Sequence, residues 1–192
     1  MINSILQKTS FSLKIKITIK TLISIAFVGL SVLLPQLVHI AFGQTGGIKL
    51  LPMYMPVIIS SLLLGYKWGL GIGIISPLIS FLITNVLLNS PMPSFERLPF
   101  MMLELGVISL ISGMFAKLVE KNVWYSLIAV LASFVAGRCI LILSVAIFQN
   151  YVTFTPTLIF NQIISGLIGI AIQMALIPLI VWGIDKLSKS NK

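Results

Sequence analysis

Two charged side chains stand inside stretches of sequence that are otherwise apolar. Arg138 is the only charged residue in the run 122–152, and Glu104 is the only one in the run 98–116. A charge at the centre of a membrane-spanning helix costs about 2.5–3.5 kcal/mol on insertion scales, so such residues normally face a bundle interior or a cavity. A guanidinium binds a carboxylate or phosphate through two parallel hydrogen bonds. These two residues are therefore the first candidates for a binding site.

The same two charges can also satisfy each other. Arg138 and Glu104 can form a buried ion pair that holds two helices together without any ligand. Such a pair is weak evidence for stability, because the desolvation of two charges can exceed their attraction. A ligand carboxylate or phosphate would be a second partner for the guanidinium, and at the level of sequence both interpretations stay open.

The composition is that of an integral membrane protein. Hydrophobic residues make up 58% of the 192 residues and charged residues 9%, and the mean hydropathy is +1.11. In hydrocarbon every backbone polar group must be bonded internally, which only helices and closed barrels achieve. The apolar runs are continuous and lack the alternation of barrel strands. We therefore predict an all-α fold in which residues 1–192 form a single membrane domain.

Six apolar runs are long enough, or nearly so, to cross a bilayer, which takes about 20 residues per helix. The predicted fold is a bundle of six transmembrane helices between a basic N-terminal segment, 1–20, and a tail, 185–192. The runs cover about 21–43, 50–66, 68–88, 98–116, 122–148 and 157–184.

The distribution of basic residues predicts the orientation. If the N-terminus is cytoplasmic, only Lys49 and Arg97 of the 13 lysines and arginines fall on the outer side, apart from Arg138 within its helix. An excess of Lys and Arg in cytoplasmic segments is the rule for membrane proteins. We therefore predict that both termini are cytoplasmic and that three loops lie outside, at 43–51, 88–98 and 149–156.

This orientation places most large polar side chains at a similar depth. A helix advances about 1.5 Å per residue, so Glu104 lies near the outer end of its helix and Arg138 lies past the midpoint of its own. We infer a polar cavity that opens outward above apolar inner halves, which suits a binding cup better than a continuous pore. The other candidates for its wall are Gln36, His39, Asn85, Asn161 and Gln162.

Small residues recur on one face of the third run. Gly65, Gly69 and Gly73 are four residues apart, and Ser76 and Ser80 extend that face. Small side chains allow another helix to approach closely. We therefore predict that this face packs inside the bundle.

Several short motifs occur in an order and spacing typical of one known family. Together they resemble the substrate-binding S components of energy-coupling factor (ECF) vitamin transporters over about residues 22–140. The motifs are Leu51-Pro-Met-Tyr-Met-Pro56, Leu64-Gly-Tyr-Lys-Trp-Gly69, Ser76-Pro-Leu-Ile-Ser-Phe-Leu82, Pro91-Met-Pro93, Met102-Leu-Glu104 and Ala136-Gly-Arg138.

The resemblance implies a six-helix subunit of a bacterial-type plasma membrane that captures a vitamin or related micronutrient from outside. The substrate would lie near the extracellular face, beneath the loop between the first two helices, so that the segment 43–56 acts as a lid. Tyr54, within that segment, stands where the family more often has histidine, and it is a candidate substrate contact. Arg138 would neutralise an anionic group of the ligand, and Glu104 would orient Arg138 or accept a ligand donor. Asn85, Asn161 and Gln162 would supply hydrogen bonds.

The resemblance also implies protein partners. An S component associates with a membrane coupling subunit and two cytoplasmic ATPases, and the sequence itself contains no GxxxxGK phosphate-binding loop. In this family small residues on the first helix dock on the coupling subunit. Ala26 and Gly29 are the candidates here, although Leu30 stands four residues after Ala26 where a second alanine is expected.

Other classes of function have less support from the residues. A stand-alone carrier or channel is the main alternative. An intramembrane enzyme would need His39 to meet Ser109 or Ser112, which lie toward the opposite side of the membrane, so we predict no catalytic activity. The single cysteine, Cys139, cannot build a metal site alone, and we predict neither a metal nor another cofactor. The net charge of +9 lies at helix ends and termini, which favours the lipid bilayer over nucleic acid as its partner.

The ligand itself is left open by the residues. Arg138 favours a molecule with a carboxylate, such as pantothenate or nicotinate. Glu104 could equally pair with a cationic or amide-rich molecule.

Overall fold

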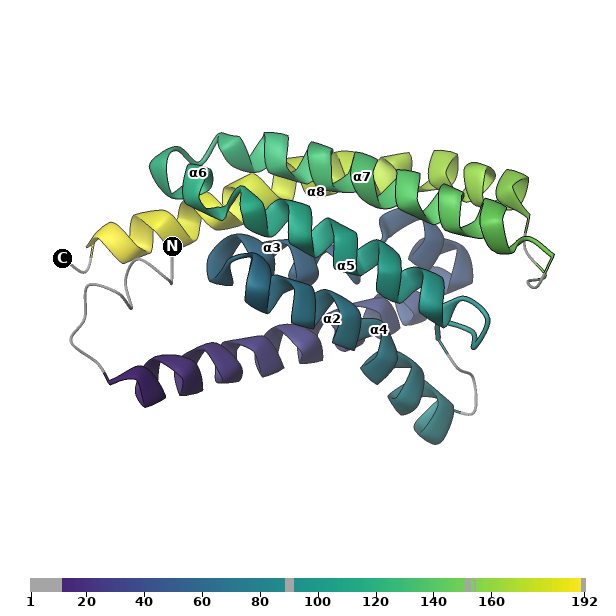
Figure 1. The fold of residues 1–192 in the computed structure, drawn as a ribbon, viewed down its shortest axis with the longest axis horizontal. Helices are drawn as coiled ribbons and strands as arrows, with labels where there is room; N and C mark the ends of the chain where they lie inside the picture. The colour runs from purple at the N-terminus through teal and green to yellow at the C-terminus, as the bar shows by residue number, and fades with distance from the viewer. Residues whose placement is uncertain (1–11, 89–91, 151–152, 154, 191–192) are drawn as a thin grey trace.

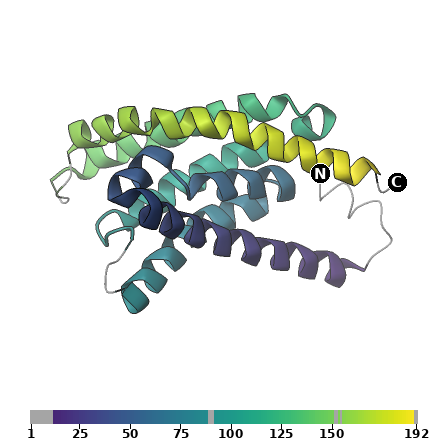
Figure 2. The same ribbon diagram turned by 180° about the vertical axis from the view of Figure 1, so that it is seen from behind.

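The protein is described here from a computed structural model that covers residues 12–88, 92–150, 153 and 155–190. All the regular elements among these residues are helices. The start of α2 and the end of α8 lie at the same end of an elongated bundle (Figure 1, Figure 2). The helices are α2 (Leu13–Leu50), α3 (Tyr54–Leu64), α4 (Tyr66–Leu88), α5 (Leu98–Met114), α6 (Ala116–Lys121), α7 (Tyr125–Phe148) and α8 (Pro156–Ser190).

Five helical stretches are long and apolar enough to cross a membrane, where six were predicted. The remaining apolar helix, α5, has 17 residues and is shorter than a typical crossing. The protein is thus all-helical with several membrane-crossing helices. These are Leu13–Gly43, Thr45–Leu64, Tyr66–Leu87, Tyr125–Phe148 and Pro156–Leu187.

The predicted boundaries at the two ends of the chain were too narrow. Helix α2 already begins at Leu13, inside the segment 1–20 that was expected to precede the first helix, and residues 1–11 lie outside the described part. Helix α8 continues to Ser190, through most of the predicted tail. Lysine is a good helix former, so a helix can continue into polar sequence beyond its apolar run, and an apolar count then underestimates the helix.

The expected outer loop 43–51 is wrong, because residues 45–50 are helical. Gly43 interrupts α2 with φ 66° and ψ −169°, a conformation that glycine adopts without steric penalty. The short helical segment after Gly43 then ends at Leu51, which has φ 51°. Pro52 cannot donate a ladder hydrogen bond, and α3 starts only at Tyr54. The second crossing, Thr45–Leu64, is therefore a helix broken between its two parts.

Helix α5 lies at the centre of the bundle and packs mainly against α4 and α7. A Cβ atom on Gly73 of α4 would lie 2.5 Å from the carbonyl oxygen of Leu105 in α5, so only glycine allows this approach. The predicted close packing is thus confirmed at Gly73, whereas Gly65 has φ 85°, ends α3 and does not share a face of α4. Central packing also explains how α5 brings a buried acidic residue to the interior.

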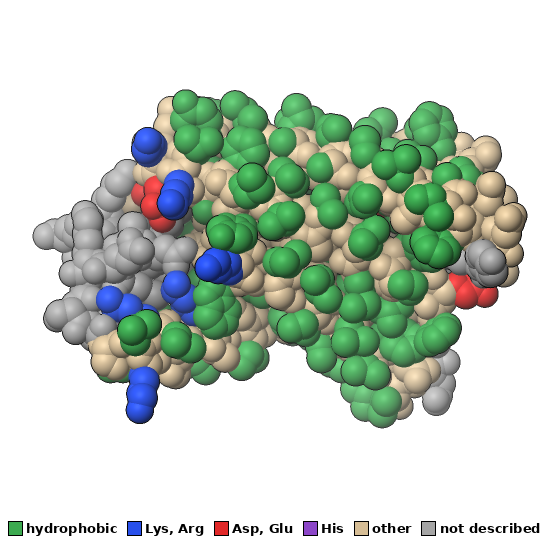
Figure 3. Space-filling model, in the orientation of Figure 1, with side chains coloured by type: hydrophobic (Ala, Val, Ile, Leu, Met, Phe, Trp, Pro, Cys, Tyr) green, Lys and Arg blue, Asp and Glu red, His purple; other side chains and the backbone are tan. Residues whose placement is uncertain are grey.

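Apolar side chains cover the middle of the molecular surface. Figure 3 shows them over much of one face, with lysines gathered at the end where α2 begins and α8 ends. Large side chains such as Leu22, Leu37 and Leu143 are 62%, 59% and 58% exposed. A surface of this kind is stable in lipid rather than in water.

Candidate functional site

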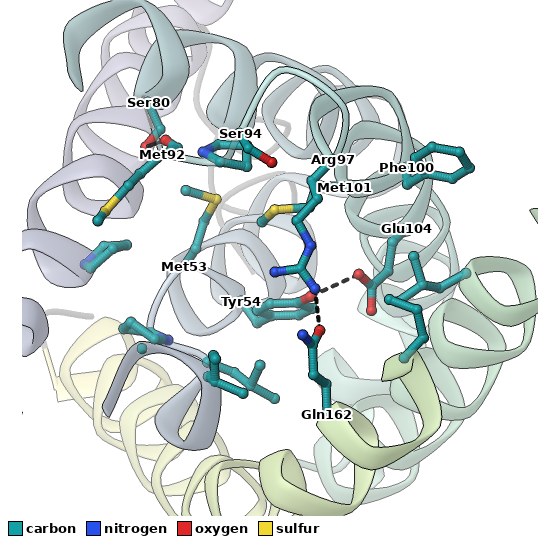
Figure 4. Close-up of a pocket in the computed structure, with 18 of the residues that line it drawn as sticks. Met53, Tyr54, Ser80, Met92, Ser94, Arg97, Phe100, Met101, Glu104 and Gln162 are labelled. Carbon is teal, nitrogen blue, oxygen red and sulfur yellow. Dashed lines mark hydrogen bonds between the residues drawn. The ribbon is translucent and has the colours of Figure 1, made fainter. Parts of the chain in front are cut away.

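A cavity of about 440 Å³ lies at the end of the bundle where α4 and α7 end and α5 and α8 begin. This is the end away from the start of α2. Its wall takes residues from six helices and from the break between Leu51 and Met53 (Figure 4). A site of this size, enclosed by several elements, is typical for a small organic ligand.

Three polar side chains from three different helices meet at this cavity. Arg138 of α7 donates from Nη1 to Oε1 of Glu104 in α5 at 2.7 Å. The hydroxyl of Tyr54 at the start of α3 donates to the other carboxylate oxygen, Oε2, at 2.8 Å. Both oxygens of Glu104 are thus engaged by protein donors. We call Tyr54, Glu104 and Arg138 the polar triad.

The triad is held by burial and by aromatic contacts. Glu104 is 1% exposed and the Arg138 side chain 12%. The Tyr54 ring stacks on Phe134 of α7, with ring centroids 5.7 Å apart, and Cζ of Arg138 lies 5.2 Å from the centroid of the same tyrosine ring. A guanidinium over an aromatic face adds an electrostatic attraction to the ion pair. The predicted pairing of Arg138 with Glu104 is therefore present, and it includes a third residue.

Not every donor of Arg138 is used. Its Nε and Nη2 atoms are buried and have no hydrogen-bond partner among the described residues. They are enclosed by protein, while Nη1 is taken by Glu104. The triad thus joins α3, α5 and α7 at the wall of the cavity.

A second arginine reaches into the cavity from the start of α5. Arg97 is the residue before the first turn of α5, and its Nη2 donates to Oε1 of Gln162 in α8. Figure 4 shows the Arg97 side chain pointing into the cavity toward Tyr54 and Gln162. Its place in the sequence predicts only a charge in an outer loop. A usable signal was its spacing, because Arg97, Met101 and Glu104 follow the i, i+4, i+7 pattern of one helix face.

The predicted site residues divide into two groups. His39 and Gln162 line the cavity together with the triad. Asn85 and Asn161 are exposed and lie outside the lining, and Gln36 is half-buried and also outside it. Gln36 follows the lining residue Pro35 and Asn161 precedes Gln162, so each is rotated by about 100° from the cavity face. Equal depth alone therefore did not bring these three side chains into the site.

Most of the remaining wall is apolar. Its residues were not among the candidates predicted from the sequence. The hydroxyl of Ser80 donates to the Met92 carbonyl at 2.8 Å and holds the segment after α4 against the cavity. The apolar members of the wall include Pro35, Ile48, Leu51, Met53, Met92, Phe100, Met101, Leu141 and Ile159.

Among the described residues, no group of three or more His, Cys, Asp or Glu could hold a metal ion.

The break before α3 is held in place by α8. Gln173 is 2% exposed, and its Nε2 donates to the carbonyls of Leu50 at 3.2 Å and Leu51 at 2.9 Å. One turn earlier, Gly169 leaves room for the same backbone, since a Cβ there would lie 2.7 Å from the Leu50 carbonyl carbon. The amide of Gln173 thus gives the Leu50 carbonyl a partner at the helix end and adds a second donor to the Leu51 carbonyl, which also accepts the Tyr54 backbone N–H. These contacts fix the position from which Tyr54 enters the triad.

Comparison with known families supports the interpretation of the motifs. A model of the family described as ECF transporter, substrate-specific component, matches residues 20–184, which include the whole cavity lining. Searches of curated proteins and of solved structures gave no significant match. The matching family is a class of transporter components and not a class of enzymes. With several membrane-crossing helices and a match over most of its length, the chain belongs to the substrate-specific components of ECF transporters.

Proposed function

We propose that this protein captures a vitamin or related micronutrient from outside a bacterial-type plasma membrane for ATP-driven uptake by partner subunits. The observation that carries the proposal is the cavity of about 440 Å³ with the polar triad in its wall. Its apolar lining would bury the body of the ligand, and His39, Gln162 and the triad would contact it. No part of this role needs a catalytic group or a bound cofactor.

The proposed orientation puts the cavity outside and both termini in the cytoplasm. The lysines of α6, of the first turns of α2 and of the last part of α8 gather at one end of the bundle, and the cavity lies toward the other (Figure 3). Positive residues concentrate on the cytoplasmic side of membrane proteins. An outward-facing cavity is the arrangement that a capture subunit requires.

The broken second crossing supports a lid. Gly47, Ile48, Leu51, Pro52 and Met53 all line the cavity, so the segment from Gly43 to Tyr54 covers part of it. Gly43, with positive φ, is a natural hinge at one end, and Gln173 clamps the backbone near the other. We propose that ligand entry moves the part near Gly43, while the clamped part stays in place.

The partners we propose are a membrane coupling subunit and two cytoplasmic ATPases. Ala26 and Gly29 are both exposed on α2, and a Cβ on Gly29 would have no neighbour within 4 Å. Residues three apart share one helix face, so another helix could approach closely there. Co-purification tests this proposal, since the tagged chain should bring down the coupling subunit and the ATPases. Transport by the chain reconstituted alone, without ATPases, would contradict it.

Ligand binding is tested with the purified full chain in detergent. Its apparent melting temperature is measured with riboflavin, thiamine, pantothenate, nicotinate, nicotinamide and biotin in turn. A ligand that binds only the folded state raises stability by about 2.7 kcal/mol at a concentration of 100 Kd. We expect one ligand to raise the melting temperature. Met101→Trp should abolish this rise, because the larger side chain fills the cavity. Met101 lines the cavity. The control is Met114→Trp, because Met114 is 62% exposed at the far end of α5.

A further inference from the structure

The charges around the cavity are unequal. Among its lining residues are two arginines, Arg97 and Arg138, and one carboxylate, Glu104. The arginines and the carboxylate of the wall therefore leave an excess of one positive formal charge. A low-dielectric cavity with one sign of charge attracts ligands of the opposite sign.

The acidic residue is already occupied, which argues against a cationic ligand. Glu104 accepts a hydrogen bond at each carboxylate oxygen, from Arg138 at 2.7 Å and from Tyr54 at 2.8 Å. A ligand ammonium would have to displace one of these buried donors. Displacing Arg138 would leave its charge buried without its partner, which is strongly unfavourable.

The two arginines differ in what they can offer a ligand. Arg138 is joined to Glu104, and its Nε and Nη2 atoms are enclosed by protein. Arg97 also has other interactions, but its side chain points into the cavity, where the neutral amide of Gln162 is one of its partners (Figure 4). A guanidinium has five N–H donors and no acceptor, so a carboxylate can join or replace an amide oxygen in front of it.

We propose that the ligand is a small monoanion with a carboxylate on an apolar body, and that Arg97, rather than Arg138, binds the carboxylate. The inference rests on the proposed capture function and adds the charge of its substrate. Gln162 holds the guanidinium in position from α8, and the methionines Met53, Met92 and Met101 contact the apolar part of the ligand. One excess positive charge matches one carboxylate better than a doubly charged phosphate monoester.

Matched ligand pairs test the charge. Dissociation constants of the purified full chain are measured for pantothenate against panthenol and for nicotinate against nicotinamide, with thiamine as a cation and riboflavin as a neutral vitamin. The acid of a pair should bind roughly 10- to 100-fold more tightly than its neutral partner, the range expected for hydrogen bonds between charged groups. Preference for a neutral or cationic ligand would overturn this inference and leave the capture function standing. Absence of binding by every ligand would overturn both.

Variants test the residue. Arg97→Gln should weaken binding of the acid by the same factor without changing the affinity for its neutral partner, and Arg97→Lys should restore part of the loss. Gln162→Glu should block the acid, because the protein then supplies the carboxylate. The control is Lys49→Gln, which removes an exposed positive charge outside the lining. Unchanged acid affinity in Arg97→Gln, with the same melting temperature as the unmodified protein, would refute the assignment.

Discussion

At the scale of single residues, the polar triad is a buried charge that the fold compensates internally. Glu104 is 1% exposed and receives one donor from α7 and one from α3. Removing one member of such a pair leaves an uncompensated charge in a low dielectric, whereas removing both leaves none. The triad should therefore respond differently to single and to paired substitution.

Glu104→Gln should lower the stability of the folded protein by about 3–5 kcal/mol, because Arg138 then remains buried without its counter-charge. For a chain of this size the loss corresponds to a fall of roughly 10 °C in melting temperature, measured by thermal unfolding in detergent. The pair Glu104→Gln with Arg138→Gln should recover most of it. Glu96→Gln is the control, since Glu96 is exposed and its carboxylate accepts a hydrogen bond from the exposed Thr153. Equal losses in the single and paired variants would show that packing, not charge, determines the effect.

Tyr54→Phe should have a smaller effect, about 1.5–3 kcal/mol, the usual contribution of a hydrogen bond to a charged group. It removes only the hydroxyl that donates to Glu104 and keeps the ring stacked on Phe134. Thermal unfolding measures the loss, with Tyr125→Phe at an exposed tyrosine as the control. A loss as large as that of Glu104→Gln would mean that the hydroxyl, and not Arg138, is the main partner of the carboxylate.

At the scale of elements, the broken second crossing is the feature that builds the cavity. Discontinuous helices expose backbone ends inside a membrane, and these must be satisfied by protein. Here α8 supplies the partner, because Gln173 donates to the carbonyls of Leu50 and Leu51. The fold thus makes an interruption stable at a depth where water is scarce.

Gly169→Ala should displace the break, since the added Cβ would lie 2.7 Å from the Leu50 carbonyl carbon and backbone cannot rotate away as a side chain can. Overpacking of this kind costs about 1–3 kcal/mol. Both the melting temperature and the ligand affinity should fall. The matched control is Gly183→Ala in the same helix, where a Cβ meets nothing within 4 Å and stability should be unchanged or slightly higher. If Gly169→Ala binds ligand as tightly as the unmodified chain, the anchoring role of α8 is refuted.

At the scale of the whole molecule, one end carries the cavity, and the other carries most of the lysines, the start of α2 and the end of α8. Between them the surface is apolar on the face shown in Figure 3. A capture subunit needs its partner on a lateral face that leaves the cavity open. The exposed small residues Ala26 and Gly29 lie on such a face, in the first part of α2.

Ala26→Leu and Gly29→Leu should prevent assembly with the coupling subunit without changing the isolated protein. The new side chains would fill space that a partner helix needs, whereas no atom of the described residues lies within 4 Å of a Cβ at Gly29. Pull-down of the coupling subunit and ATPases by the tagged chain measures assembly, and ligand affinity of the isolated chain checks folding. Gly71→Leu on α4 is the control, because it also has open space at its Cβ. Normal assembly by both α2 variants would exclude this face.

What could be predicted from the sequence follows from local chemistry. Composition and the continuous apolar runs together predicted membrane helices, since only helices and closed barrels satisfy the backbone in hydrocarbon and barrel strands alternate. The motifs led to the family, which the match over residues 20–184 confirms. The isolated charges at 104 and 138 were expected to meet a partner at membrane depth, and they meet each other.

The tertiary structure decided which side chains share the cavity. Position along a helix predicts depth, but the rotation of each helix about its axis depends on how all the helices pack. This is why Asn85, Asn161 and Gln36 lie off the cavity while Arg97, assigned to a loop, enters it. The break before α3 likewise depends on Gln173, about 120 residues away in the chain. The Gln173 side chain donates to the carbonyls of Leu50 and Leu51 at the break. Contacts between residues so distant in sequence are set by packing and not by any local pattern.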